Sequence, residues 1–143
     1  MSVKEIIKNM VPKFIFEAVS AHNRLKHQEL TSKKSSAGIK ELLKASRPIK
    51  LELGAGDRSM EGWTSVDMND NCALNLDLTA PIPFPDNSVS MIYSSHVLEH
   101  FKITELFNLL NECKRILRPD GIFSASVPNS RIYLEAYSNP QGF

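Results

Sequence analysis

The stretch Lys50-Leu51-Glu52-Leu53-Gly54-Ala55-Gly56-Asp57 decides the fold of this chain. Its short apolar run predicts a buried strand, and the two glycines that follow predict a tight turn. Gly54 and Gly56 tolerate a positive φ and let a ligand approach the backbone without meeting a Cβ. The N–H groups of such a turn can bind an anion such as a carboxylate, so this turn is a candidate binding site.

The two glycines do not complete a dinucleotide-binding fingerprint. The pattern G-x-G-x-x-G fails because Ser59 stands where the third glycine would be. Asp67 also follows Gly56 by only 11 residues, which is too few for a full crossover helix before the next strand. The turn alone therefore does not distinguish a ligand site from an ordinary tight turn.

Downstream of this turn, short apolar segments alternate with helical or polar segments, a pattern that predicts an α/β fold with a parallel sheet. Strands are expected over Ile49–Leu53, Trp63–Asp67, Leu74–Leu78, Val89–Ser94 and Ile122–Val127. Helices are expected over Ile103–Leu117 and Arg131–Tyr137, with a proline- and glycine-containing turn at Arg118–Gly121. In such sheets, ligands bind at the carboxyl ends of the strands, near the point where the strand order reverses.

Upstream of the turn, the chain has a different character. Apolar residues recur at helical spacing over residues 2–29, with Pro12 expected to kink the helix or to begin a second one. A polar linker is expected over Thr31–Gly38, followed by a short helix over Ile39–Ala45. We therefore divide the chain into a helical N-terminal segment, residues 1–46, and an α/β domain, residues 47–143.

Charge is distributed unevenly along the chain. Residues 1–50 hold eleven Lys and Arg against four Glu, whereas the remainder holds six Lys and Arg against twelve acids. A basic helical arm on an acidic body packs on its own domain or contacts a membrane surface through residues 1–30. No nucleic-acid partner is expected, because aromatic residues do not alternate with the basic ones.

The cysteine content and the terminal sequence indicate a cytoplasmic location. Cys72 and Cys113 fit no CxxC or zinc spacing, and two isolated cysteines suit free thiols in a reducing compartment. The N-terminus lacks the basic head and apolar centre of a signal peptide, and no apolar run is long enough to span a bilayer. Association with the membrane would then rest on the basic arm.

Three acids stand at or near the ends of successive strands, in an order that suits one kind of ligand. Glu52 precedes the glycine turn, Asp67 ends the second strand and Asp77 falls near the end of the third. A carboxylate can bind an amine, accept from the two hydroxyls of a ribose, or accept from an exocyclic amine of adenine. Together these positions suit a ligand that carries an amine, a diol and an adenine.

Residues 47–128 resemble a class I S-adenosylmethionine-dependent methyltransferase. The segments that carry the resemblance are Leu51–Gly56, the strand that ends at Asp67, Asp77-Leu78, Pro81–Ser88, Tyr93–His100 and Lys114–Gly121. The short interval between Gly56 and Asp67 resembles a bacterial subgroup that often accompanies surface-polysaccharide synthesis. The resemblance implies a Rossmann-like sheet of order 3-2-1-4-5 with S-adenosylmethionine as the cofactor.

The resemblance also implies roles for individual residues. The methionine end of the cofactor would be held by Glu52, Gly54, Ala55 and Gly56, the ribose by Asp67 and Met68, and the adenine by Asp77 and Leu78. Ser94, Ser95 and His96 would flank the reactive methyl group, with His96 as the candidate general base. The acceptor implied is a hydroxyl of a glycan, with a quinone or another small molecule as the alternative.

The chain departs from the family pattern in two ways. Arg58 stands where a third glycine is usual, and the last two of the seven family strands are missing from the expected elements. The fifth strand would then be a sheet edge, which a homo-oligomer could cover. These departures leave open a degenerate methyltransferase-like domain that acts as a binding or scaffold module.

A second motif overlaps the first. His96-Val97-Leu98-Glu99-His100 also spells H-x-x-E-H, an inverted zinc-peptidase signature. On an α-helix, the two histidines would share a face and could bind zinc, with Glu135 as the best-placed third ligand. We rank this zinc peptidase as a remote alternative and expect no metal site, because the segment directly follows a predicted strand.

Overall fold

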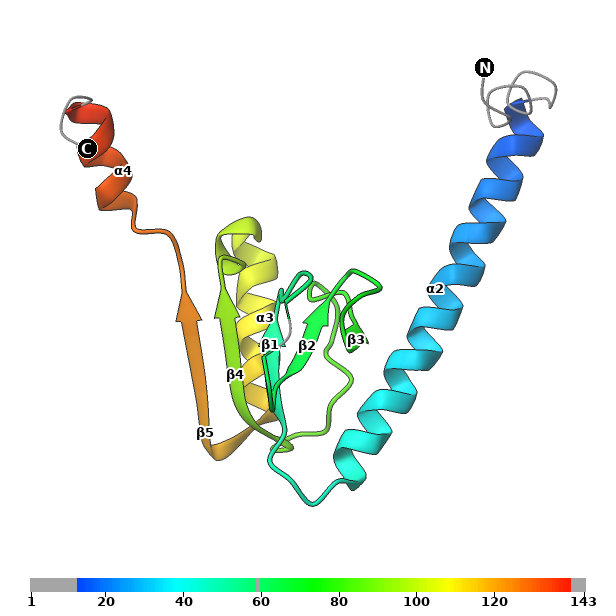
Figure 1. The fold of residues 1–143 in the computed structure, drawn as a ribbon, viewed down its shortest axis with the longest axis horizontal. Helices are drawn as coiled ribbons and strands as arrows, with labels where there is room; N and C mark the ends of the chain where they lie inside the picture. Colours follow the sequence, from blue (N-terminus) through cyan, green and yellow to red (C-terminus); the bar gives the residue numbers. More distant parts are fainter. Residues whose placement is uncertain (1–12, 59, 140–143) are drawn as a thin grey trace.

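The computed structural model describes residues 13–58 and 60–139 (Figure 1). A long helix precedes a parallel sheet, and a second long helix connects the last two strands of the sheet. In chain order the elements are α2 (Lys13–Lys44), β1 (Lys50–Leu53), β2 (Thr64–Asp67), β3 (Leu74–Asn75), β4 (Val89–Ser95), the 3₁₀ helix η1 (Leu98–His100), α3 (Ile103–Ile116), β5 (Leu117–Ser126) and α4 (Ser130–Ser138). The predicted alternation of strands and helices is confirmed.

The sheet has five parallel strands in the order β3-β2-β1-β4-β5, as the resemblance implies. The order reverses between β1 and β4, where Glu52 pairs with Tyr93 and Leu53 pairs with Ser94. Because both strands end at the same level, the glycine turn after β1 and the segment after β4 emerge side by side. This is the position at which open α/β sheets bind ligands.

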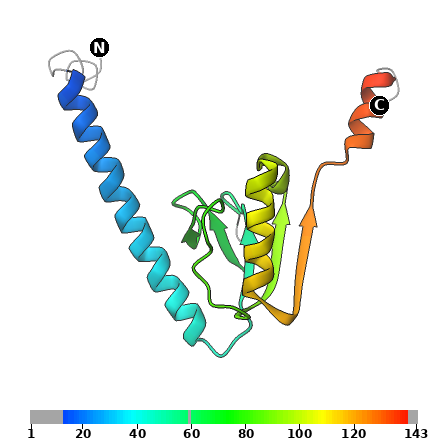
Figure 2. The same ribbon diagram turned by 180° about the vertical axis from the view of Figure 1, so that it is seen from behind.

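One face of the sheet carries the hydrophobic core. Leu51 and Leu53 of β1 share this face with Val66 of β2 and Ile92 of β4, since paired residues in a ladder point to the same side. Helix α3 covers it, as the view from behind shows (Figure 2), and contributes buried Leu109, Cys113 and Ile116. The loop between β3 and β4 adds buried Ile82 and Phe84.

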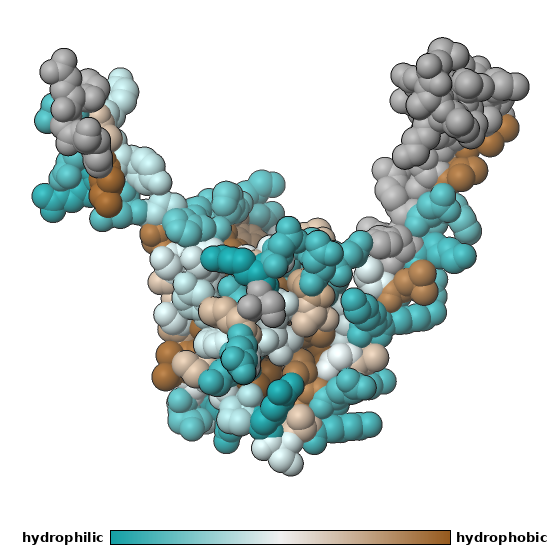
Figure 3. Space-filling model, in the orientation of Figure 1, coloured by the Kyte–Doolittle hydropathy of each residue, from teal (hydrophilic) through white to brown (hydrophobic). Residues whose placement is uncertain are grey.

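The opposite face is more open. Lys50, Trp63 and Tyr93 lie on it, with the Trp63 and Tyr93 rings edge to face at a centroid distance of 6.1 Å. The Lys50 ammonium lies 5.8 Å from the centre of the Trp63 ring. Strand β5 forms an edge of the sheet, and Ile122 on it is exposed. Hydrophobic patches reach the surface on this side of the molecule (Figure 3).

The predicted polar linker at Thr31–Gly38 is wrong, because α2 runs through it without interruption. Ser35 is buried there, and its hydroxyl donates to the carbonyl of Asn75 and accepts from the same residue's N–H. Gly38 leaves room for Leu74, and Ile39 enters the core. Packing against β3 therefore stabilises a helix that its local composition does not favour.

The part of α2 before these contacts projects away from the sheet in both ribbon views (Figures 1 and 2). The predicted kink at Pro12 lies outside the described residues. Among residues 13–58 and 60–139, no helix has the length and apolar character needed to cross a membrane.

Two further boundaries differ from the prediction. The third strand is only Leu74–Asn75, since its continuation turns away at Asp77. The fifth strand begins earlier than predicted, at Leu117, so the predicted turn Arg118–Gly121 lies within β5. The backbone is compact there, since a Cβ on Gly121 would lie 2.9 Å from the carbonyl oxygen of Arg118. These residues form an irregularity in the ladder: the partners in β5 step from Leu117 to Ile122 while β4 advances only from Val89 to Met91.

Candidate functional site

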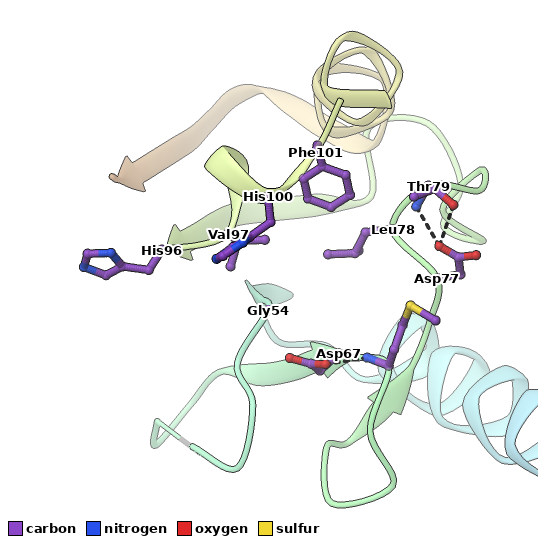
Figure 4. A pocket seen from close by; sticks show the side chains of 10 residues that line it. Gly54, Asp67, Asp77, Leu78, Thr79, His96, Val97, His100 and Phe101 are labelled. Atoms are coloured by element: carbon purple, nitrogen blue, oxygen red, sulfur yellow. Dashed lines mark hydrogen bonds between the residues drawn. The ribbon is translucent and has the colours of Figure 1, made fainter. Parts of the chain in front are cut away.

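A pocket of about 290 Å³ opens at the carboxyl ends of β1, β2 and β4 (Figure 4). Its walls come from the glycine turn, the end of β2, the loop after β3 and the segment after β4. The residues that line it are Gly54, Asp67, Met68, Asp77, Leu78, Thr79, His96, Val97, His100 and Phe101. An apolar side formed by Leu78, Val97 and Phe101 thus faces a rim of carboxylates and imidazoles.

Gly54 adopts a conformation that only glycine accepts readily. Its φ is +63°, and its N–H donates to the carbonyl of Val66 at 2.8 Å, which holds the turn against β2. A Cβ on Gly54 would overlap the side chain of Val97. Gly54 therefore allows the segment after β4 to pack directly on the turn after β1, and this contact shapes the pocket floor.

Asp67 connects the glycine turn to the end of β2. Its Oδ2 accepts the N–H of Gly56 at 2.8 Å, and its Oδ1 accepts the N–H of Met68 at 2.6 Å. Each carboxylate oxygen has a second lone pair, so the same group can still accept from a ligand hydroxyl. The two backbone bonds fix the orientation in which it would do so.

Asp77 is held in a turn with Thr79. Its Oδ1 accepts both the N–H of Thr79 at 2.9 Å and the Thr79 hydroxyl at 2.7 Å (Figure 4). The neighbouring Leu78 is buried and lines the pocket as well. A carboxylate beside an apolar side chain is suited to the edge and face of a planar base.

Two buried oxygen atoms near the site have no hydrogen-bond partner among the described residues. They are Oε2 of Glu52 and Oγ of Ser94. The Glu52 side chain is only 2% exposed, so an unpaired carboxylate oxygen there is costly unless a donor reaches it. The ammonium group of an amino-acid moiety would supply such a donor at the turn after β1.

Ser94 occupies a different environment. It pairs with Leu53, so its side chain shares the core face with Ile92, and it is fully buried. Glu52 pairs with Tyr93 and lies on the opposite face of the sheet. The two unpaired oxygens therefore do not form one cluster, although both belong to the strands that flank the switch point.

The segment after β4 is an irregular turn. His96 has φ of +56°, which is uncommon for a residue other than glycine, and its N–H donates to the carbonyl of Ser126 at 2.9 Å. Its Nδ1 lies 3.4 Å from Oε1 of Glu99. Residues 98–100 then form a single 3₁₀ turn.

This geometry contradicts the zinc-peptidase alternative, which requires His96 and His100 on one face of an α-helix. His96 precedes the 3₁₀ turn in a non-helical conformation. Within the described part of the chain, no group of three or more His, Cys, Asp or Glu side chains could hold a metal ion.

The loop that leads from Asp77 to β4 is held by two residues of α3. Glu112 accepts the N–H of Ile82 at 2.8 Å, and Arg115 donates to the carbonyls of Ile82 and Phe84 and to Asp86. Arg115 also bonds Glu112, and this hydrogen bond lowers the pKa of the Glu112 carboxyl group. The α3 helix thereby anchors one wall of the pocket.

The structure brings together six of the eleven predicted site residues as pocket lining. They are Gly54, Asp67, Met68, Asp77, Leu78 and His96. The other five, Glu52, Ala55, Gly56, Ser94 and Ser95, do not line it. Arg58 is exposed and is also not part of the lining, while its N–H donates to Ala55 within the turn.

Four lining residues were not predicted as site residues: Thr79, Val97, His100 and Phe101. The spacing Asp77-Leu78-Thr79 is a usable signal, because an Asp two residues before Thr favours this turn. Val97 and His100 belong to the segment that the resemblance already includes. Phe101 gave no signal of its own.

The residues present fit S-adenosylmethionine. The glycine turn and the buried Glu52 oxygen suit its amino-acid end, Asp67 suits a ribose, and Asp77 with Leu78 suits an adenine. The order of these groups along the strand ends matches the order of the parts in that molecule.

Comparison with known proteins agrees with this chemistry. A family model described as a methyltransferase domain matches residues 54–125. A probable S-adenosylmethionine-dependent methyltransferase of Mycolicibacterium smegmatis is 40% identical over 50 residues, which make up 35% of this chain and 19% of that protein. The aligned part of the chain thus spans about a fifth of the relative's length.

Two solved structures align with most of this chain. A putative S-adenosylmethionine-dependent methyltransferase from Methanococcus maripaludis has a TM-score of 0.42 at 18% identity, covering 80% of this chain and 70% of that one. A chain in the complex between the Haloferax volcanii Trm112 methyltransferase activator and the putative methyltransferase has a TM-score of 0.48 at 20% identity, covering 87% and 66%.

Proposed function

The chain belongs to the family of S-adenosylmethionine-dependent methyltransferase domains, and we propose that it transfers a methyl group from this cofactor to an acceptor hydroxyl. The observation that carries the proposal is the unpaired, buried Oε2 of Glu52 beside the glycine turn. The ammonium group of the cofactor's amino-acid end would give this oxygen the donor that it lacks, so the observation supports cofactor binding, and transfer itself is tested with acceptors.

The cofactor would be held by groups from three strand ends. Glu52 and the backbone of Gly54, Ala55 and Gly56 would hold its amino-acid end. Asp67 and Met68 would hold its ribose, and Asp77 and Leu78 its adenine. When bound, S-adenosylmethionine supplies a methyl group on a cationic sulfur, which becomes a neutral thioether once a nucleophile has taken the methyl.

The protein's own contribution is to position the acceptor and to exclude water. The apolar wall of Leu78, Val97 and Phe101 favours a dry site. Ser94 and Ser95 precede His96 along β4, and we assign them to the support of this wall rather than to contact with the acceptor. His96 stands at the rim with its imidazole directed outward from the other lining side chains (Figure 4), and we assign it to accept a proton from a hydroxyl bound on that side.

For the acceptor we propose a hydroxyl of a glycan or of another small molecule. The short interval between Gly56 and Asp67 supports this choice, because it resembles the bacterial subgroup linked to surface polysaccharides. A lipid-linked glycan would suit contact between the basic arm and a membrane surface. Liposome co-sedimentation of the full chain and of a variant lacking residues 1–30 tests the contact, and equal sedimentation of the two would refute it.

Calorimetric titration with S-adenosylhomocysteine, the demethylated product, tests the proposed cofactor. We expect saturable binding with one ligand per chain, and competition by S-adenosylmethionine. A folded sample that binds neither compound would refute the proposal. Binding accompanied by no transfer to a panel of glycan and small-molecule acceptors would favour the scaffold alternative.

A further inference from the structure

The pair formed by His96 and Glu99 is not explained by cofactor binding. The Nδ1 atom of His96 lies 3.4 Å from Oε1 of Glu99, and both residues belong to the segment that follows β4. From this geometry we propose that Glu99 is a positioning residue, which holds the His96 imidazole in the tautomer that can accept a proton from the acceptor. The inference rests on the proposed function and names its acceptor class, a neutral hydroxyl.

The His96 backbone is constrained independently of its side chain. Its φ of +56° carries a conformational cost for a residue other than glycine. The bond from its N–H to the carbonyl of Ser126 at the end of β5 maintains this conformation. The sheet thus fixes the backbone position from which the His96 side chain extends, and Glu99 orients the imidazole ring.

The pair contributes little to folding. The His96 side chain is 60% exposed and the Glu99 side chain 28%, and ion pairs at such exposure have a small net effect on stability. Residues 98–100 form only one 3₁₀ turn, in which no residue is buried. A role in directing the imidazole accounts for the arrangement better than a role in stability.

The chemistry follows from the two ring nitrogens. The Glu99 oxygen, 3.4 Å from Nδ1, makes no hydrogen bond in this conformation, but its negative charge favours the neutral tautomer that carries the proton on Nδ1. This tautomer leaves the lone pair of Nε2 available. When an acceptor hydroxyl loses its proton, the O–H bond breaks, its electron pair stays on the oxygen and an N–H bond forms at Nε2. The resulting imidazolium is then paired with the Glu99 carboxylate. An acceptor that is already anionic would not need this base.

His100 provides an internal comparison. It also lines the pocket, yet no carboxylate of the described residues pairs with its ring. The two histidines lie in the same segment and differ in this contact. His100 should therefore show the Nε2–H tautomer that free histidine prefers, while His96 shows the Nδ1–H tautomer.

Long-range ¹⁵N–¹H correlation spectra of the four imidazoles test this inference on the full chain without ligand. They are recorded near pH 9, above the ordinary imidazole pKa of about 6.5. His96→Gln assigns the His96 signals by deleting them. We expect the Nδ1–H pattern at His96, and its loss in Glu99→Ala and in Glu99→Met, which has similar length but no oxygen. The exposed Glu41→Ala should leave the pattern unchanged.

The inference is overturned if His96 shows the Nε2–H pattern in the wild type, or if both Glu99 variants retain the Nδ1–H pattern. Thermal melts show that each variant is folded before its spectrum is compared. Since the tautomer is measured without cofactor, its outcome is separate from the S-adenosylhomocysteine titration. Binding without the Nδ1–H pattern refutes the role of Glu99 alone, whereas absent binding refutes the proposed function.

Discussion

The carboxylate of Asp67 accepts the N–H of Gly56 at 2.8 Å and thereby joins the end of β2 to the turn after β1. The same carboxylate lines the pocket. One side chain thus shapes the glycine turn and presents an acceptor to the ligand. Loss of the Asp67 carboxylate should disturb both the glycine turn that would hold the amino-acid end of S-adenosylmethionine and the contact with its ribose.

Asp67→Ala should weaken binding of S-adenosylhomocysteine by roughly tenfold to a hundredfold, because hydrogen bonds to a charged group contribute about 1.5–3 kcal/mol. Calorimetric titration measures the change. Asp120→Ala is the matched control, since Asp120 is an exposed acid of β5 outside the pocket lining. Equal affinity of Asp67→Ala and the wild type would contradict the assigned role.

Gly54 and Gly56 provide a controlled pair. Both have positive φ, +63° and +59°, but only a Cβ on Gly54 would meet a neighbour, the side chain of Val97. Gly56→Ala should lower the free energy of unfolding by about 1–2 kcal/mol, because alanine is strained in the left-handed conformation. Gly54→Ala should lower the free energy of unfolding by about 1–3 kcal/mol more, because its methyl group would also be overpacked against Val97. Urea unfolding of the two variants measures the difference, and equal midpoints would show that Val97 does not press on the turn.

Ser35 tests why the predicted linker is helical. Its hydroxyl makes two bonds to the backbone of Asn75 in a buried position. Ser35→Ala leaves those groups without a partner and should lower the free energy of unfolding by about 1–3 kcal/mol. The adjacent Ser36 is exposed, so Ser36→Ala should stay within about 0.5 kcal/mol of the wild type in the same urea titration. Similar losses in both variants would assign the effect to helix propensity instead.

The parts of the fold that were predictable are those with strong local signals. Strand β1 and helix α3 were predictable from their apolar residues. Burial of a strand or of one helix face requires such residues in a run or at a regular spacing. Thr31–Gly38 misled the prediction since its helix depends on β3, which lies about forty residues further along the chain. Arg118–Gly121 has the composition of a turn, but its position inside β5 follows from pairing with β4 on either side, which has no local signal.

The candidate site likewise contains residues with a local sequence signal and contacts that depend on pairing between distant strands. Asp67 was found because the end of β2 is recognisable in sequence, and Asp77 was found although β3 ends at Asn75, two residues before it. The contact of Val97 with the glycine turn depends on the pairing of β1 with β4, which no local pattern states. His96, which lies 3.4 Å from Glu99, has a positive φ, and histidine gives only a weak indication of that conformation.

The hydrogen bond between Arg115 and Glu112 makes stability depend on pH. It is the largest cause of the lowered pKa of Glu112, so the folded state binds this proton less readily than the unfolded state. The stabilisation is therefore complete above the unfolded carboxyl pKa of about 4.3 and is lost as the pH falls through the lowered folded pKa. Glu112→Gln cannot titrate. It should be less stable than the wild type by roughly 1 kcal/mol at pH 6, and the difference should shrink towards pH 3.

Urea unfolding between pH 3 and pH 6 measures this convergence. Glu135→Gln is the matched control, because Glu135 also accepts from an arginine at 2.7 Å but in an exposed pair on α4. That variant should follow the wild-type curve at every pH, since exposed pairs contribute little. A constant difference between Glu112→Gln and the wild type would mean that Glu112 acts through packing alone. The anchoring of the pocket wall by α3 would then not depend on the charge of Glu112.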